Sequence, residues 1–213
     1  MLVTSHKFIE KYPINFDSKI LILGTIHPHN IEEFVVNFFY GNKASLWKIL
    51  NKALPDELQN PVNLSSILNF LKNRKIAVSD TILKCERNKP TALDKDLKPI
   101  MLNKEIVDGI KKSRISEILC TSGFDKNNAF RLFYCDILGL KINNKIKNDR
   151  EVTLPPSIFG RPITVKVLYS PSGSSNTGIV KSKLYLKDKH LYEHSKTPVA
   201  DFKINYYRSA FQI

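Results

Sequence analysis

The chain has 213 residues, and its hydrophobic content of 42% and charged content of 25% are typical of a folded globular protein rather than a disordered one. Lysine and arginine number 33 against 20 aspartate and glutamate residues, so the net charge is +13, which favours an anionic partner such as nucleic acid or an acidic membrane surface. The 3 cysteines form no CxxC pair, and no apolar run is as long as a signal-peptide core or a membrane span, so we expect a cytoplasmic protein without a metal site.

The first strong element is an uninterrupted apolar run from Ile20 to Leu23, which is typical of a strand buried on both faces. We expect residues 1–19, before it, to form a polar lead-in. Gly24 and Thr25 end the strand, and His27-Pro28-His29 occupies the connection that follows. Since ligands of open α/β sheets bind outside the carboxyl ends of the strands, this connection is the first place to expect a pocket.

Helical and strand patterns then alternate along the chain. The predicted helices are Ser45 to Ala53, Asn63 or Ser65 to Leu71, Lys104 to Lys112, Asp125 to Leu138, and an amphipathic stretch from Val199 to Phe211. The predicted strands are Ile76 to Asp80, Ile115 to Cys120 and Val165 to Tyr169. Residues 85–97 look polar and turn-rich, and residues 141–164 look like a basic excursion or hairpin. Four apolar runs separated by helices predict a parallel sheet with helices on both faces.

Three of the predicted strands deliver polar groups at their carboxyl ends. His27 follows the first strand, Asp80 ends the second, and the loop Ser170 to Asn176 follows the fourth. If the strands are parallel, all three meet at one rim of the sheet. The small residues of the loop would let its backbone N–H groups approach a phosphate, although a solvated surface loop is the alternative.

At this point four motifs in order resemble those of the uracil-DNA glycosylase superfamily, with greatest similarity to its mismatch-specific and little-characterised bacterial branches. The motifs are LILGTIHP, FFYGNKASLWKIL, IAVSDTILKCERNKPTALDKDL and VLYSPSGSSNTG. The resemblance covers about residues 19–178 of what we expect to be a single domain, 1–213, and leaves 179–213 as a basic C-terminal extension. It implies a three-layer α/β/α sandwich with a central four-stranded parallel sheet.

The resemblance also implies an activity, which is hydrolysis of the N-glycosidic bond of a damaged or mismatched base, uracil or a deaminated purine, in base-excision repair. The enzyme would act on duplex DNA as a monomer without a cofactor, and would flip the target base out of the helix. The transition state is a sugar cation with a departing base anion. It needs a polarised water or a carboxylate on the sugar side and hydrogen-bond donors on the base side.

By the same resemblance, the expected catalytic residues are His27, Asp80 and Asn42. Related sequences carry Asn or Asp where this chain has His27, which could orient water, stabilise the leaving base, or mark a protein that kept the fold and lost the chemistry. Neither outer motif holds a carboxylate, which makes Asp80 the acidic candidate. The expected substrate-binding residues are Gly24, Thr25, Pro28, Phe39, Tyr40, Ser45, Ser170, Pro171, Ser172, Gly173, Ser174 and Asn176.

Two other functions remain open from the sequence. One is a non-catalytic nucleic-acid-binding protein on the same scaffold, and the other is a hydrolase or transferase that acts on a free nucleotide or nucleoside. Strong duplex binding without base release would favour the first. Base release from free nucleosides but not from DNA would favour the second.

Overall fold

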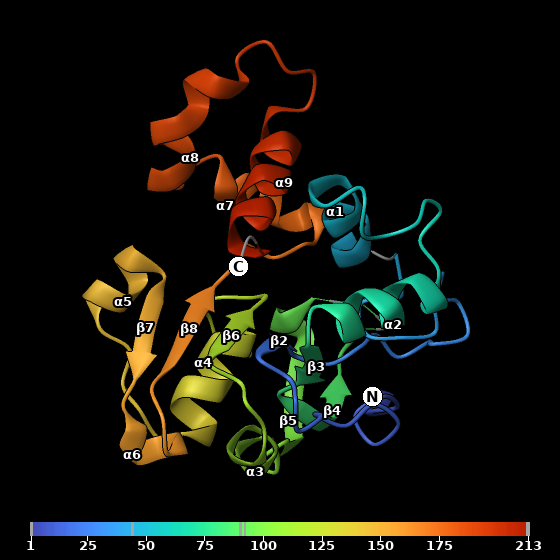
Figure 1. Cartoon of the computed structure of the whole chain (residues 1–213), viewed down its shortest axis with the longest axis vertical. Helices are drawn as coiled ribbons and strands as arrows, with labels where there is room; N and C mark the ends of the chain where they lie inside the picture. The colour runs from blue at the N-terminus through green and yellow to red at the C-terminus, as the bar shows by residue number, and fades with distance from the viewer. Residues whose placement is uncertain (1, 44, 90, 92, 212–213) are drawn as a thin grey trace.

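The computed structural model describes residues 2–43, 45–89, 91 and 93–211 (Figure 1). Its centre is a five-stranded sheet in the order β3-β2-β6-β8-β7, in which the first four strands are parallel and β7 is antiparallel at the edge. The strands are β2 (Ile20–Gly24), β3 (Ile76–Asp80), β6 (Glu117–Cys120), β7 (Glu151–Leu154) and β8 (Ile163–Val167). The four parallel strands therefore lie where the apolar runs predict them, within a few residues at their ends.

The fifth strand corrects the expectation of a purely parallel four-stranded sheet. In β7 only Leu154 is buried, while Glu151 and Thr153 are exposed, so this edge strand has no apolar run that could announce it. It pairs with β8 after a short connection through helix α6 (Pro156–Phe159). The expected basic excursion at residues 141–164 is thus a hairpin that widens the sheet.

A second, three-stranded antiparallel sheet in the order β1-β4-β5 was not predicted. Its strands are β1 (Leu2–Ser5), β4 (Ile82–Arg87) and β5 (Leu97–Leu102). Residues 1–19 are therefore more than a lead-in, and residues 85–97 are not all irregular. These strands escaped prediction because β1 and β5 bury few of their side chains, and the buried residues of β4 are interrupted and include Cys85 and Arg87.

Helices cover both faces of the large sheet (Figure 1). Alternate residues of β2 point to opposite sides: Ile22 packs with α1, α2 and α9, whereas Leu21 and Leu23 pack with α3 and α4. The longer helices are α1 (Ser45–Ala53), α2 (Leu64–Asn73), α3 (Ile106–Lys112) and α9 (Pro198–Phe211), all close to their predicted ranges. The shorter ones are α4 (Ala129–Arg131), α5 (Asn144–Asp149), α7 (Asn176–Ile179) and α8 (Lys183–Asp188).

Two local features refine the predicted helices. Asn63 caps α2, since its side-chain oxygen accepts a hydrogen bond from the Ser66 N–H at 2.9 Å. The helix predicted from Asp125 begins only at Ala129 and passes into a π-helical turn over Leu132–Ile137. Within the described ranges, no helix has the length and apolar character that crossing a membrane requires.

Candidate functional site

A cavity of about 770 Å³ opens at the carboxyl ends of the parallel strands. Most of the residues proposed from the sequence line it, although they come from four separate parts of the chain. Those residues are Thr25, His27, Pro28, Tyr40, Asn42, Ser45, Asp80, Ser170, Pro171, Ser172, Gly173 and Ser174. The other three expected residues, Gly24, Phe39 and Asn176, do not line it.

The carboxylate of Asp80 is held in place by a histidine from the N-terminal segment. The distance between His6 Nε2 and Asp80 Oδ2 is 2.8 Å, and both side chains are buried. His6 Nδ1 accepts the backbone N–H groups of Phe8 and Ile9, which assigns the ring proton to Nε2. The neutral ring therefore donates to Asp80. None of the described residues donates a hydrogen bond to the other carboxylate oxygen, Oδ1.

Gly24 forms the floor beneath this carboxylate. A Cβ on Gly24 would lie 2.3 Å from Asp80 Oδ1 and 2.4 Å from the Tyr40 hydroxyl oxygen, so only glycine allows both groups to approach. Gly24 thus shapes the site although it does not line the cavity. The Tyr40 and Thr121 hydroxyls are hydrogen-bonded at 2.9 Å. Burial, assisted by the negative charge of Asp80, raises the pKa of Tyr40 well above its usual range and keeps the hydroxyl protonated.

Both ring nitrogens of His27 form hydrogen bonds with the protein's own backbone. Its Nδ1–H donates to Pro28 O at 2.7 Å, and its Nε2 accepts the Lys7 N–H at 3.1 Å. Burial lowers the pKa of His27 to about 4, which agrees with a neutral ring in this tautomer. The buried Arg87 donates to His27 O at 2.5 Å and fixes the same loop.

A second carboxylate, Asp94, lines the same cavity next to the end of β2. Its Oδ1 accepts the Thr25 hydroxyl at 2.9 Å. With the Asn128 amide oriented to satisfy both of its neighbours, its nitrogen donates to Asp94 Oδ2 at 3.0 Å. Burial raises the pKa of Asp94 to about 6, although hydrogen bonds from Thr25 and Ser122 act in the opposite direction. Asp94 therefore changes charge close to neutral pH.

The loop Ser170 to Asn176 is held from behind by Lys203 of α9. The buried ammonium donates to Ser172 O at 3.0 Å, Ser175 Oγ at 3.1 Å and Asn176 Oδ1 at 2.8 Å. All of these acceptors are neutral, and burial lowers the pKa of Lys203 to about 8. Asn176 thus faces the lysine and not the cavity, while the outer side of the loop remains open.

The remaining expected residues divide between wall and core. Asn42 and Ser45 lie at the cavity wall, on either side of the start of α1. Phe39 is buried in the core, where its ring centroid is 5.2 Å from that of Phe38, and its carbonyl accepts the indole N–H of Trp47 at 2.7 Å. Phe39 is therefore a packing residue in this structure, and Tyr40 is the aromatic that reaches the cavity.

Sequence reasoning missed His6, Thr121, Asp94 and Lys203. His6 stands in a polar segment with no pattern around it, and Asp94 lies in a stretch that looks irregular. Thr121 offered a usable signal, because it directly follows an apolar strand and so belongs to the same rim as Asp80. Within the described part of the chain, no group of three or more His, Cys, Asp or Glu side chains is placed to hold a metal ion.

Comparisons with known proteins leave the family of this chain open. No protein-family model matches it, and no curated protein sequence matches it. Among solved structures it is similar to the solution NMR structure of a candidate uracil DNA glycosylase from Methanosarcina acetivorans, with 16% identity and a TM-score of 0.47. That similarity covers 96% of this chain and 98% of the other.

Proposed function

We propose that the protein is a DNA glycosylase that hydrolyses the bond between a damaged or mismatched base and its deoxyribose. The observation that carries the proposal is the carboxylate of Asp80, which His6 holds at one oxygen while the other stands beside the Tyr40 hydroxyl. It lies in a cavity of about 770 Å³, which is within the usual range for small-molecule sites and large enough for a flipped nucleotide. The order of the sequence motifs supports the same activity.

In this mechanism the two chemical needs of the reaction are met by different side chains. The ionised Asp80 stabilises the positive charge that develops on the sugar, or takes a proton from the attacking water. The protonated hydroxyl of Tyr40, which contacts Thr121 Oγ1 at 2.9 Å, turns its hydrogen to the departing base, while the Thr121 hydroxyl donates to Leu23 O at 3.3 Å. Because Asp80 is already fixed by His6, the carboxylate does not need to reorganise when the charge appears.

His27 has a positioning role in this proposal instead of the catalytic role expected from the sequence. Both of its ring nitrogens are bonded to backbone groups, so proton transfer would first require one of those bonds to break. The Lys7 N–H that it accepts follows His6 directly in the chain. His27 therefore holds the segment that brings His6 to Asp80.

The test is incubation of the protein with duplex oligonucleotides that carry uracil, hypoxanthine, xanthine or ethenocytosine, followed by alkaline cleavage of the abasic product. We expect base release from at least one of these substrates. Asp80→Asn should lower the rate by about 10²–10⁴-fold with little change in duplex affinity, since positioned acid–base groups contribute that much. The exposed Asp56→Asn serves as the control that loses the same charge away from the site.

The alternatives predict different results in the same assay. Tight duplex binding without release of any base would favour a non-catalytic nucleic-acid-binding protein. Release from free nucleosides but not from oligonucleotides would favour a nucleoside hydrolase. An Asp80→Asn variant with full activity would remove this carboxylate from the mechanism.

A further inference from the structure

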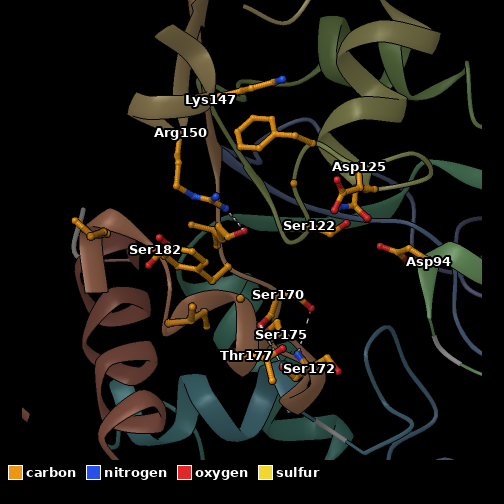
Figure 2. A pocket seen from close by; sticks show the side chains of 18 of the residues that line it. Asp94, Ser122, Asp125, Lys147, Arg150, Ser170, Ser172, Ser175, Thr177 and Ser182 are labelled. Carbon is orange, nitrogen blue, oxygen red and sulfur yellow. Dashed lines mark hydrogen bonds between the residues drawn. The ribbon is translucent and has the colours of Figure 1, made fainter. Parts of the chain in front are cut away.

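Besides the cavity that holds Asp80, the described structure has a second cavity of similar size. It has a volume of about 840 Å³ and is also lined by residues of the loop Ser170 to Asn176 (Figure 2). The two cavities share part of their walls, including Asp94, Ser122 and Ser170. A ligand strand that leaves the first cavity over this shared wall therefore enters the second.

Two lysine-rich segments that are distant in the sequence meet at this second cavity. Lys147 of α5 and Lys183 of α8 both line it, and both are exposed. Neither has a carboxylate within ion-pair distance among the residues that the structure describes. Asp149 lies at the same wall, and Lys95 lies beside Asp94. The cationic side chains gathered at the α5 and α8 walls suit a phosphate.

The same cavity is lined by a platform of one guanidinium and two aromatic rings. Arg150 Cζ is 4.3 Å from the Tyr169 ring centroid and 5.5 Å from that of Phe124, and all three residues line the cavity. Arg150 donates to the carbonyls of Val167 at 2.8 Å and Leu168 at 2.9 Å, which fixes its position. None of the carboxylates in the described ranges forms an ion pair with it. Rings and guanidinium planes are the surfaces on which nucleic-acid bases stack.

Acidic side chains occupy the opposite wall. In Figure 2, Lys147 and Arg150 lie on one side of the cavity, and Asp94 and Asp125 lie on the other. The acids repel a phosphate and accept hydrogen bonds from the N–H groups of a base. A nucleotide would therefore enter in one orientation, with its phosphate towards the lysines and its base edge towards the carboxylates.

We propose that the two cavities bind two nucleotides of one strand. The flipped nucleotide fills the first cavity, and a nucleotide next to it in the same strand binds in the second. The inference rests on the proposed function, because it takes the strand to be DNA. It adds that the enzyme binds the damaged strand with more than one nucleotide unpaired from the complementary strand. A strand with at least one neighbour should then bind better than a single nucleotide.

The test compares two double charge reversals in binding to fluorescently labelled, undamaged single-stranded oligonucleotides. Lys147→Glu with Lys183→Glu changes the cavity, whereas Lys111→Glu with Lys112→Glu makes the same change in net charge on the exposed surface of α3. For a hexanucleotide, the cavity variant should show a salt slope less steep by about 1.4, since each phosphate contact on a single strand contributes about 0.7. The α3 variant should keep the parent slope. Equal losses in both variants would overturn the proposal.

The aromatic platform is tested separately, at constant charge. Tyr169→Leu should weaken binding of the hexanucleotide by about tenfold, in keeping with the stacking of one base, while Tyr169→Phe should bind like the parent. For a mononucleotide, the difference in affinity between Tyr169→Leu and the parent should be smaller than for the hexanucleotide. A Tyr169→Leu variant that binds the hexanucleotide as tightly as the parent would contradict the stacking.

Base release by the same variants separates this inference from the proposed function. If the protein releases no base but the cavity variants lose strand binding, the second cavity is a binding site and the glycosylase activity is contradicted. If the protein releases a base and the cavity variants bind the strand as tightly as the parent, the glycosylase activity is supported and the second binding site is contradicted.

Discussion

At the scale of single residues, Asp80 is placed by neighbours that cannot easily be exchanged. His6 holds one carboxylate oxygen, and Gly24 leaves the space that the other oxygen and the Tyr40 hydroxyl occupy. His6 in turn depends on backbone N–H groups for its tautomer. The orientation of the carboxylate therefore exists before any substrate arrives, which is the arrangement that charge stabilisation in a transition state requires.

Asp94 provides a residue-scale prediction about stability and pH. Its pKa is raised from 3.8 to about 6 in the folded protein. The folded state thus binds this proton more tightly than the unfolded state, and its contribution to stability is present below about pH 4 and lost as the pH rises through 6. The side chain in Asp94→Asn is neutral at every pH. We therefore expect the free energy of unfolding of this variant, relative to that of the parent, to rise by at most about 3 kcal/mol between pH 4 and pH 7.5.

The measurement is urea unfolding of both proteins at the two pH values. Asparagine retains an oxygen that can accept the Thr25 hydroxyl, so the substitution tests charge more than hydrogen bonding. The exposed Asp125→Asn is the control and should follow the parent. A constant difference between Asp94→Asn and the parent would show that Asp94 does not titrate in this range.

The residues of the site were predictable where they follow an apolar strand and hidden where they do not. Asp80 and Ser170 could be predicted because they lie at or just after the carboxyl ends of buried strands, where the ligands of open α/β sheets bind. His6 has no such marker, since its meaning depends on a partner 74 positions away. The proposed change of His27 from a catalytic to a positioning role rests on its hydrogen bonds to the backbone, which no pattern of side chains reveals.

At the scale of elements, helix α9 does more than cover the sheet. Tyr207 and Phe211 pack it into the core shared with α1, and Arg208 Nε donates to Ala53 O at 2.9 Å. This anchoring places Lys203 beneath the loop Ser170 to Asn176. The stretch expected to be a basic extension thus has a structural connection to the candidate site.

We expect Lys203→Met to weaken duplex DNA binding by about tenfold, because the loop would lose its three hydrogen bonds and would have to be ordered by the ligand. The melting temperature should change little, since removal of a buried cation also removes the cost of its desolvation. Duplex affinity and melting temperature are measured beside those of Lys196→Met, a control at an exposed lysine. Unchanged affinity in Lys203→Met would mean that the loop keeps its shape without the lysine.

The elements also show why part of the fold escaped prediction. Strands buried on both faces, such as β2 and β3, produce runs of apolar residues that stand out in the sequence. The strands of the small sheet and β7 lie at edges or over solvent, and their burial patterns are interrupted. For such strands the pairing partner decides the structure, and the partner is not visible in the strand itself.

At the scale of the whole molecule, the net charge of +13 predicts how binding depends on salt. If the partner is duplex DNA, the logarithm of the affinity should fall linearly with the logarithm of the salt concentration, with a slope of roughly −0.9 for each phosphate neutralised. Fluorescence anisotropy with an undamaged duplex measures this slope. Binding that does not respond to salt between low and physiological concentrations would contradict an electrostatic interaction with DNA.

The position of Lys203 also sets the order in which the site can be completed during synthesis. The chain emerges from the ribosome with its N-terminus first, so His6, Asp80 and all strands of the sheet appear before α9. A growing chain could already bring His6 and Asp80 together, but it could not yet fasten the loop Ser170 to Asn176 from behind. The loop would thus be fastened only once α9 has docked against α1.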